Sequence, residues 1–156
     1  MTTAEQRLAE LGLELPPPPG AVAAYEPWVR VGNLVFTSGQ LPWRDGTTLL
    51  FKGQIGRDLT VEQGYAACQL ATLNAIAQLK AACGGDLERV RRVVRIEGTL
   101  HVAPGTSETT PKVLNGASEL VNSVFGERGR HTRMIYTLTE VVLDSACLIV
   151  LWAEVE

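Results

Sequence analysis

The apolar positions of the chain follow helical spacing in two long segments. The first, 60–83, begins at Thr60, a residue type that caps helices, and stops before a Gly-Gly pair. The second, 111–125, has Pro111 in its first turn, where a missing backbone N–H costs little. Both segments therefore predict amphipathic helices. The apolar positions are Tyr65, Leu70, Leu73, Ile76 and Leu79 in the first, and Val113, Leu114, Ala117, Leu120, Val121 and Val124 in the second.

Alternation of apolar and polar residues predicts strands in most of the remaining chain. The predicted strands are two within 28–42 around a Gly32–Asn33 turn, one at 91–103, and two at 132–141 and 146–155. The segment 44–56 is rich in turn residues and contains one short strand at most, and 104–111 is a loop. This order of elements predicts an α+β domain in which two helices cover one face of a mixed sheet.

The first twenty residues carry a pattern of their own. Thr2 and Glu5 have the spacing of a capping box and predict a short helix over 3–12. Four consecutive prolines within 16–20 predict a stiff connector, because proline cannot continue a helix or a central strand. We therefore divide the chain into an N-terminal helix with its connector, 1–20, and a single domain, 21–156.

The last predicted strand, "CLIVLWAEV" at 147–155, is apolar on both of its faces. Two helices can cover only one face of a sheet, and a strand with two apolar faces is typical of a sheet buried on both sides. The second face is therefore expected to lie against another subunit, which predicts a homo-oligomer. The alternative is that the N-terminal segment of the same chain folds over this face.

Composition narrows the classes of partner. A net charge of −3 and a pI near 5.5 disfavour a nucleic-acid partner. No signal-peptide pattern opens the chain and no apolar run reaches about 18 residues, so we expect a cytoplasmic protein with no membrane partner. Cys68, Cys83 and Cys147 form no CxxC motif and are expected to be buried thiols. With only two histidines in the chain, the sequence predicts no metal site.

The stretch "GERGRHTRMIY", 126–136, places three arginines and a histidine before a predicted strand. Strand alternation puts Arg133 and Ile135 on one side and Met134 and Tyr136 on the other. A guanidinium at such a position can pair bidentately with a carboxylate, or it can simply be solvated at the strand end. His131 is equally open: it can act as a proton donor near a site or serve a structural role.

The stretch "TSGQLP", 37–42, follows a predicted strand with a serine and Gly39. Its hydroxyls and backbone N–H groups can line a pocket, or the segment can be an ordinary turn. The chain has no glycine-rich phosphate loop, no G-x-S-x-G and no HExxH motif. Glu97, Glu140 and Glu154 lie on or beside predicted strands, and none has a second carboxylate at a spacing that indicates a glycosidase pair.

Taken in order, several of these stretches resemble the RidA/YjgF family, also labelled endoribonuclease L-PSP. The resemblance runs from Tyr25 to Val155 and rests on Tyr25 itself, "GNLVFTSGQLP", "VLNGASELVNSVFG" and "RHTR". The head "RLAELGLELPPPPG" and the segment "KGQIGRDLTVEQG" resemble a longer subgroup of roughly 150-residue members.

The resemblance implies a chorismate-mutase-like fold and a homotrimer with a central β-barrel and a ligand cleft at each subunit interface. It implies no cofactor. In active members the reaction hydrolyses a 2-imino acid or enamine to a 2-keto acid and ammonia. On the matching positions of this sequence, Arg133 holds the substrate carboxylate. The cleft is lined by Tyr25, Ser38, Gly39 and Asn115, together with Ile135 and Val150.

Two positions depart from the family pattern. Deaminating members carry a glutamate in the last strand where this chain has Val150, and a cysteine where it has Ile135. A positioned acid or base contributes about 10²–10⁴-fold to proton transfer, so the loss of the glutamate bears directly on activity. His131 and Tyr25 remain as candidate acid–base groups.

The sequence thus supports two functions. The first is an enamine or imine deaminase, a hydrolase with Arg133 gripping the substrate carboxylate. The second is a non-catalytic protein on the same scaffold that binds a small carboxylate such as a keto acid, which the valine at position 150 favours. Ribonuclease activity, suggested by the family label, is disfavoured by the acidic pI and the lack of an aromatic stacking platform.

Overall fold

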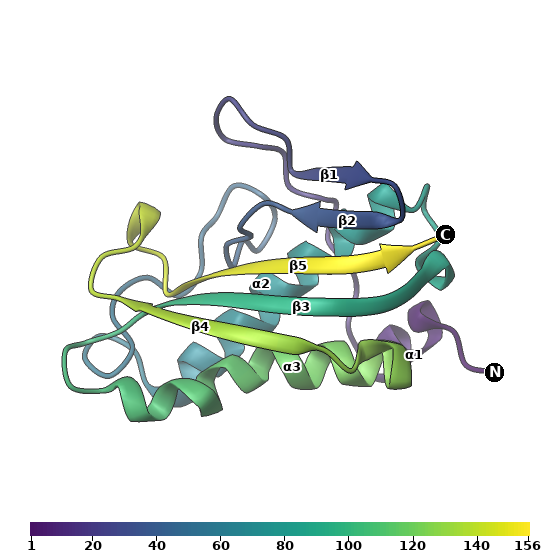
Figure 1. Cartoon of the computed structure of the whole chain (residues 1–156). Helices are drawn as coiled ribbons and strands as arrows, with labels where there is room; N and C mark the ends of the chain where they lie inside the picture. Colours follow the sequence, from purple (N-terminus) through teal and green to yellow (C-terminus); the bar gives the residue numbers. More distant parts are fainter.

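The computed structural model describes residues 1–156 and contains one five-stranded sheet (Figure 1). In spatial order the strands are β1 (Trp28–Val31), β2 (Leu34–Thr37), β5 (Cys147–Val155), β3 (Val90–His101) and β4 (Thr132–Leu138). All neighbours are antiparallel except β3 and β4, which run parallel. The predicted α+β fold with a mixed sheet is confirmed, and β1 and β4 form its two edges.

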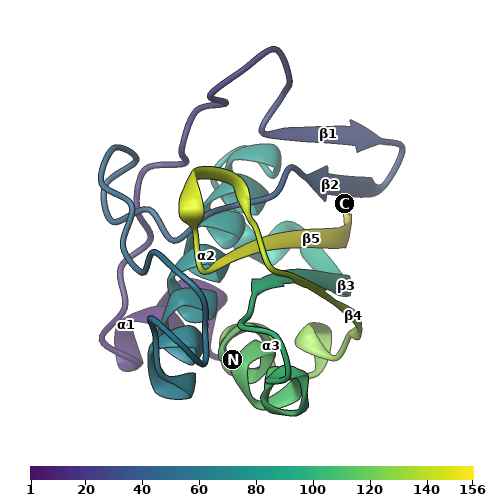
Figure 2. The ribbon, with the colours of Figure 1, turned by 90° about the vertical axis from the view of Figure 1, so that its left-hand side faces the viewer.

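Both long helices, α2 (Val61–Ala82) and α3 (Thr110–Phe125), lie on the same face of the sheet (Figure 2). Thr60 and Gln63 form the predicted capping box of α2, in which each side chain accepts from the other's backbone N–H. Pro111 lies in the first turn of α3, as predicted. The helices cross closely at Gly116, where a Cβ atom would lie 2.1 Å from the Tyr65 carbonyl oxygen.

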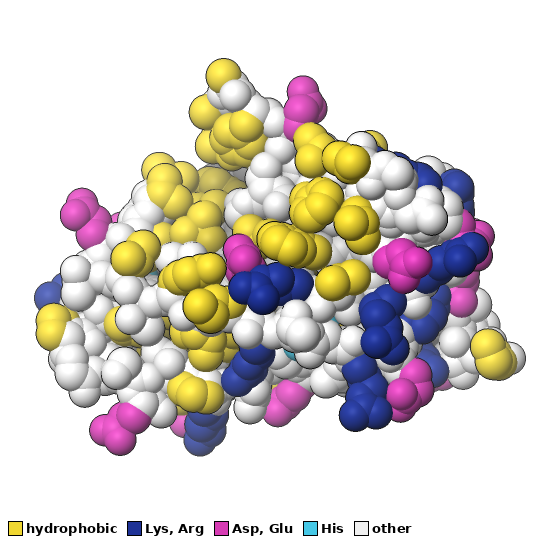
Figure 3. Space-filling model, in the orientation of Figure 1, with side chains coloured by type: hydrophobic (Ala, Val, Ile, Leu, Met, Phe, Trp, Pro, Cys, Tyr) yellow, Lys and Arg dark blue, Asp and Glu magenta, His cyan; other side chains and the backbone are white.

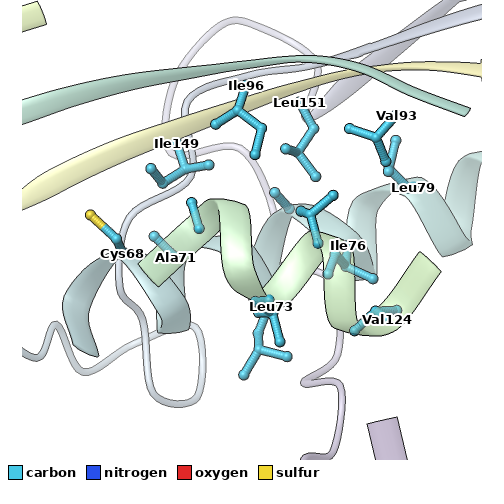
Figure 4. Close-up of a cluster of buried hydrophobic side chains, with 14 of the residues drawn as sticks. Cys68, Ala71, Leu73, Ile76, Leu79, Val93, Ile96, Val124, Ile149 and Leu151 are labelled. Carbon is cyan, nitrogen blue, oxygen red and sulfur yellow. The ribbon is translucent and has the colours of Figure 1, made fainter. Parts of the chain in front are cut away.

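The sheet and the two helices enclose one hydrophobic core (Figure 4). Val93 and Ile96 of β3 and Ile149 and Leu151 of β5 point towards the helices and are fully buried. The small residues of α2 let this helix pack close to the sheet. The N-terminal helix α1 (Ala4–Glu10) joins the same core.

Two local predictions were wrong, and the short strand that the sequence allowed within 44–56 did not form. The cap of α1 is Thr3 with Gln6, not Thr2 with Glu5; helix α1 begins at Ala4, which is fully buried and donates its N–H to Glu88. The segment 44–56 contributes only single bridging pairs, because its backbone turns through several left-handed residues. Strand β4 ends at Leu138, before the predicted 141. The Thr139 carbonyl is hydrogen-bonded to the side chains of Gln54 and His101 and not to a neighbouring strand.

The outer face of β5 carries apolar side chains, as the sequence indicated. Leu148, Val150 and Trp152 point away from the helices and are partly exposed in the single chain. Hydrophobic side chains gather over β1, β2 and β5 on this open face (Figure 3). The N-terminal segment does not cover this face. Helix α1 packs beside α3, and the proline connector lies against the C-terminal part of α2. That alternative is therefore wrong.

Candidate functional site

Arg133 lies on the edge strand β4, and its guanidinium reaches α3. One terminal nitrogen donates to Asn115 Oδ1 at 2.9 Å and to Ser118 Oγ at 3.2 Å, and the other donates to the Pro111 carbonyl at 3.2 Å. All three acceptors are neutral, and no carboxylate lies within 4 Å of this arginine. The side chain is thus held in place while its positive charge stays available for an anion.

His131 lies beside this arginine and is bonded through both ring nitrogens. Its Nδ1 lies 2.6 Å from the Gly129 carbonyl, so Nδ1 carries the proton and donates; its Nε2 then accepts from Ser118 Oγ at 2.9 Å. Burial and, secondarily, the charge of Arg133 lower the pKa of His131, against an opposing contribution from the Gly129 bond. The neutral ring holds Ser118, which holds Arg133, so this geometry favours a structural role. We call Arg133, Asn115, Ser118 and His131 the Arg133 cluster.

A second group of predicted residues lines a cavity of about 340 Å³ near the β1–β2 end of the sheet, here called the Tyr25 cavity. Ser38 donates from Oγ to the Glu26 carbonyl at 2.5 Å and from N to the Pro27 carbonyl at 2.8 Å, which fixes the turn. Gly39 packs closely against Leu148: an added Cβ would lie 2.9 Å from Leu148 Cδ2, so this side chain would have to shift. The lining residues from distant parts of the chain are Val22, Tyr25, Trp43, Val142, Leu143 and Leu148.

The two groups do not meet within one chain. The Arg133 cluster lies at the β4 edge and on α3, whereas the Tyr25 cavity lies beside β2 and the start of β5. Strands β5 and β3 separate β2 from β4 (Figure 1). The single subunit therefore brings together Arg133 with Asn115, and Tyr25 with Ser38 and Gly39, but not one pair with the other.

Ile135 and Val150, the two departures from the family pattern, lie on opposite faces of the sheet. Ile135 shares the helix side of β4 with Arg133 and packs against the core. Val150 lies on the open face, and its register partner on β3 is Glu97. Glu97 accepts from Arg95 Nε at 3.0 Å, and the Arg95 guanidinium lies 5.6 Å from the Trp152 ring centre. A carboxylate is therefore present next to Val150, one strand away.

Sequence reasoning could not connect Glu97 to this position, because register between strands is not visible in one sequence. It also missed Asn74 and Gln78, two polar residues four apart in the buried stretch of α2. Both reach out of the helix to hold loops around the Tyr25 cavity. Polar residues at helical spacing inside an alanine-rich segment were the available signal.

Three further features of the chain bear on its chemistry. No group of three or more His, Cys, Asp or Glu side chains could hold a metal ion. No helix is long and apolar enough to cross a membrane. All three cysteines are buried; the hydrogen bond that the Cys147 thiol makes to Cys68, together with burial, raises the pKa of Cys147 and favours its protonated form.

Residues 5–155 match the family model described as "YjgF/chorismate_mutase-like, putative endoribonuclease". This chain belongs to that YjgF family. The match covers nearly the whole chain, including both parts of the candidate site, and agrees with the resemblance read from the sequence.

Three proteins are similar to this chain over most of their length. A protein from Shewanella oneidensis MR-1 with the same endoribonuclease description is 52% identical, with a TM-score of 0.94 over 98% of this chain and 99% of its own. Protein Atu1372 from Agrobacterium tumefaciens is 37% identical, with a TM-score of 0.90 over 98% and 92%. Protein TCP17 from Trypanosoma cruzi is 38% identical over 89% of this chain and 86% of its own.

A more distant structure, that of E. coli TdcF with bound serine, shows the shared fold. It is 23% identical, with a TM-score of 0.60 over 90% of this chain and 94% of its own.

Proposed function

We propose that this YjgF-family protein is a Rid-type deaminase that hydrolyses 2-imino acids to 2-keto acids and ammonia. The observation that carries the proposal is the Arg133 guanidinium, oriented by three neutral acceptors and free of any carboxylate partner. Such a group suits the carboxylate of a small substrate. The serine bound to TdcF supports a small ligand of this type in the family.

The complete site would form between subunits of a homotrimer. The Arg133 cluster of one subunit would then face the Tyr25 cavity of its neighbour, since neither part can reach the other in the same chain. The apolar open face of β5 supports such an assembly, because a sheet face of this composition is stable only when covered.

The reaction needs an oriented water and a route for protons. Water adds across the C=N bond: its oxygen bonds to carbon, and one proton passes to nitrogen. The C–N bond then breaks as the remaining hydroxyl proton passes to nitrogen, so that the ketone and ammonia leave. Arg133 can orient the substrate but cannot accept a proton at neutral pH. We assign the role of the base to Glu97, whose carboxylate lies beside Val150 on the open face.

Ammonia and keto-acid release from enzymatically generated imino acids tests the proposal. Wild-type protein is expected to accelerate release, and Arg133→Ala to lower the rate by about 100-fold or more, because two charge-assisted hydrogen bonds to the carboxylate are lost. Arg130→Ala is the matched control, since Arg130 is 73% exposed and pairs only with Glu127. Equal rates for both variants would remove Arg133 from the mechanism.

The alternative is a non-catalytic protein that binds a small carboxylate through Arg133. The valine at position 150 favours it, because the carboxylate nearest that position is already paired with Arg95. Titration with keto acids distinguishes the two functions. Binding that depends on Arg133, with no acceleration of imine hydrolysis, would establish the alternative. RNA binding that survives physiological salt would contradict both.

A further inference from the structure

We propose that the Tyr25 cavity receives the side chain of the substrate and selects large apolar side chains, branched or aromatic, over small or charged ones. This inference rests on the proposed function and names the substrate class for that same site. It concerns the wall that the N-terminal connector and the 142–144 turn add to the cavity.

The lining of the cavity sets the chemistry of its occupant. None of its 14 lining residues is an Asp, Glu, Lys, Arg or His, and they include the large apolar side chains of Trp43, Leu143 and Leu148. A charged substrate side chain would lose its hydration there without gaining a partner. The volume of about 340 Å³ lies at the lower end of the range for small-ligand pockets, which suits one side chain and its adjoining carbons.

Buried hydrogen bonds hold this wall in place. Gln78 of α2 is 1% exposed and donates from Nε2 to the Pro19 carbonyl at 2.7 Å and to Gln40 Oε1 at 3.3 Å. One turn earlier, Asn74 donates from Nδ2 to the carbonyls of Leu41 and Trp43 at 2.9 and 3.1 Å. Two side chains of one helix thus hold the proline connector and the 40–43 segment together, so the cavity is a formed feature of the fold.

The opposite wall contains backbone in an unfavourable conformation. Leu143 and Asp144 both have left-handed φ values, 57° and 58°, which non-glycine residues adopt only when the surroundings enforce them. The Asp144 carbonyl accepts from Gly53 N at 2.8 Å, and the backbones of Lys52 and Ser145 form an antiparallel β-bridge. These two contacts hold the turn. The result is that Val142 and Leu143 line the cavity although each is more than half exposed. Exposed apolar side chains held by strained backbone at a cavity point to a ligand contact.

Calorimetric titration of the full-length protein with three keto acids tests the inference: 4-methyl-2-oxopentanoate, pyruvate and 2-oxoglutarate. The wild type is expected to bind the branched acid at least about tenfold more tightly than pyruvate, since its three additional apolar carbons are removed from water in the pocket. 2-Oxoglutarate, with its second carboxylate, is expected to bind more weakly than pyruvate.

Leu143→Asn is the informative variant, because asparagine tolerates left-handed backbone and keeps the turn intact. We expect it to reduce the tenfold preference to about threefold or less without changing the affinity for pyruvate. Leu11→Asn, at the exposed end of α1, is the matched control and should leave the preference unchanged.

The outcomes separate this inference from the proposed function. Binding abolished by Arg133→Ala but equal for pyruvate and the branched acid overturns the inference alone, as does a preference that Leu143→Asn leaves intact. Absence of any Arg133-dependent binding overturns both. Light scattering gives a further check: if Leu143→Asn dissociates the assembly, the cavity holds a neighbouring copy of the chain and not a ligand.

Discussion

The Arg133 cluster and the Tyr25 cavity lie at opposite ends of one sheet and hold their surroundings by opposite means. In the cluster, successive hydrogen bonds from Gly129 through His131 and Ser118 hold the positively charged Arg133. The cavity is an apolar wall fastened from behind by amides of α2. The first arrangement suits a carboxylate and the second suits a side chain. Under the proposed function, the two parts together would recognise an amino-acid-like ligand.

Changing Glu97 tests where the chemistry lies between these two parts, and we expect the largest effect here. Glu97→Gln should lower the rate of imine hydrolysis by about 100-fold while leaving keto-acid affinity unchanged, because an amide cannot accept a proton from water. Rate measurements under saturating substrate, together with titration, give the two quantities. The control is Glu154→Gln. Glu154 lies on the same open face of the sheet as Glu97, but on β5 and four residues beyond Val150. An unchanged rate in Glu97→Gln would remove Glu97 from the mechanism and assign the base role to another group.

Replacing Gln78 tests whether the cavity depends on its buried amide. Gln78→Leu keeps the volume but leaves the Pro19 carbonyl without a donor, which should cost about 2 kcal/mol in the free energy of unfolding. Urea unfolding measures this loss, and binding of pyruvate through Arg133 should persist. Gln69→Leu, on the same helix and with no side-chain hydrogen bond, should stay within about 0.5 kcal/mol of the wild type. If both variants unfold alike, the wall is held by packing alone.

Acid should affect the Arg133 cluster and spare the cavity, which has no group that titrates near neutral pH. Because the folded-state pKa of His131 is lowered, the unfolded chain binds a proton first as pH falls below about 6.5. Stability is therefore full above that pH and declines as the pH falls through the folded-state pKa. The charge of Arg133 adds to the lowering of the His131 pKa. Arg92 and Arg130 are the other charged residues that line the surface hollows beside this ring.

Of the effects expected for Glu97, Gln78 and His131, the change in melting temperature between pH 7 and pH 5 that depends on His131 is the smallest. His131→Asn should show a weaker acid loss than the wild type, since it removes the titrating group while keeping polar contacts to Ser118. Thermal melts at matched ionic strength measure the difference. An identical loss in both proteins would assign the acid sensitivity to other groups.

Much of the fold could be predicted because its signals are local. The Thr60 capping box, the early proline of α3 and the apolar run of β5 each depend on residues a few positions apart, and the structure confirms all three. The cap of α1 was misplaced by one residue, since Thr2 and Thr3 are equally able to cap. Only contact with the core selects Thr3, because Ala4 and Leu8 must be buried.

By itself, the sequence determined the elements, the doubly apolar last strand and an arginine suited to a carboxylate, since these follow from short-range spacing and side-chain chemistry. Only the tertiary structure decided that Glu97 stands beside Val150, that Gln78 fastens the proline connector, and that Arg133 and Tyr25 lie on separate parts of the subunit. These facts depend on strand register and loop placement. Both are set by contacts between residues far apart in the chain, which local patterns do not encode.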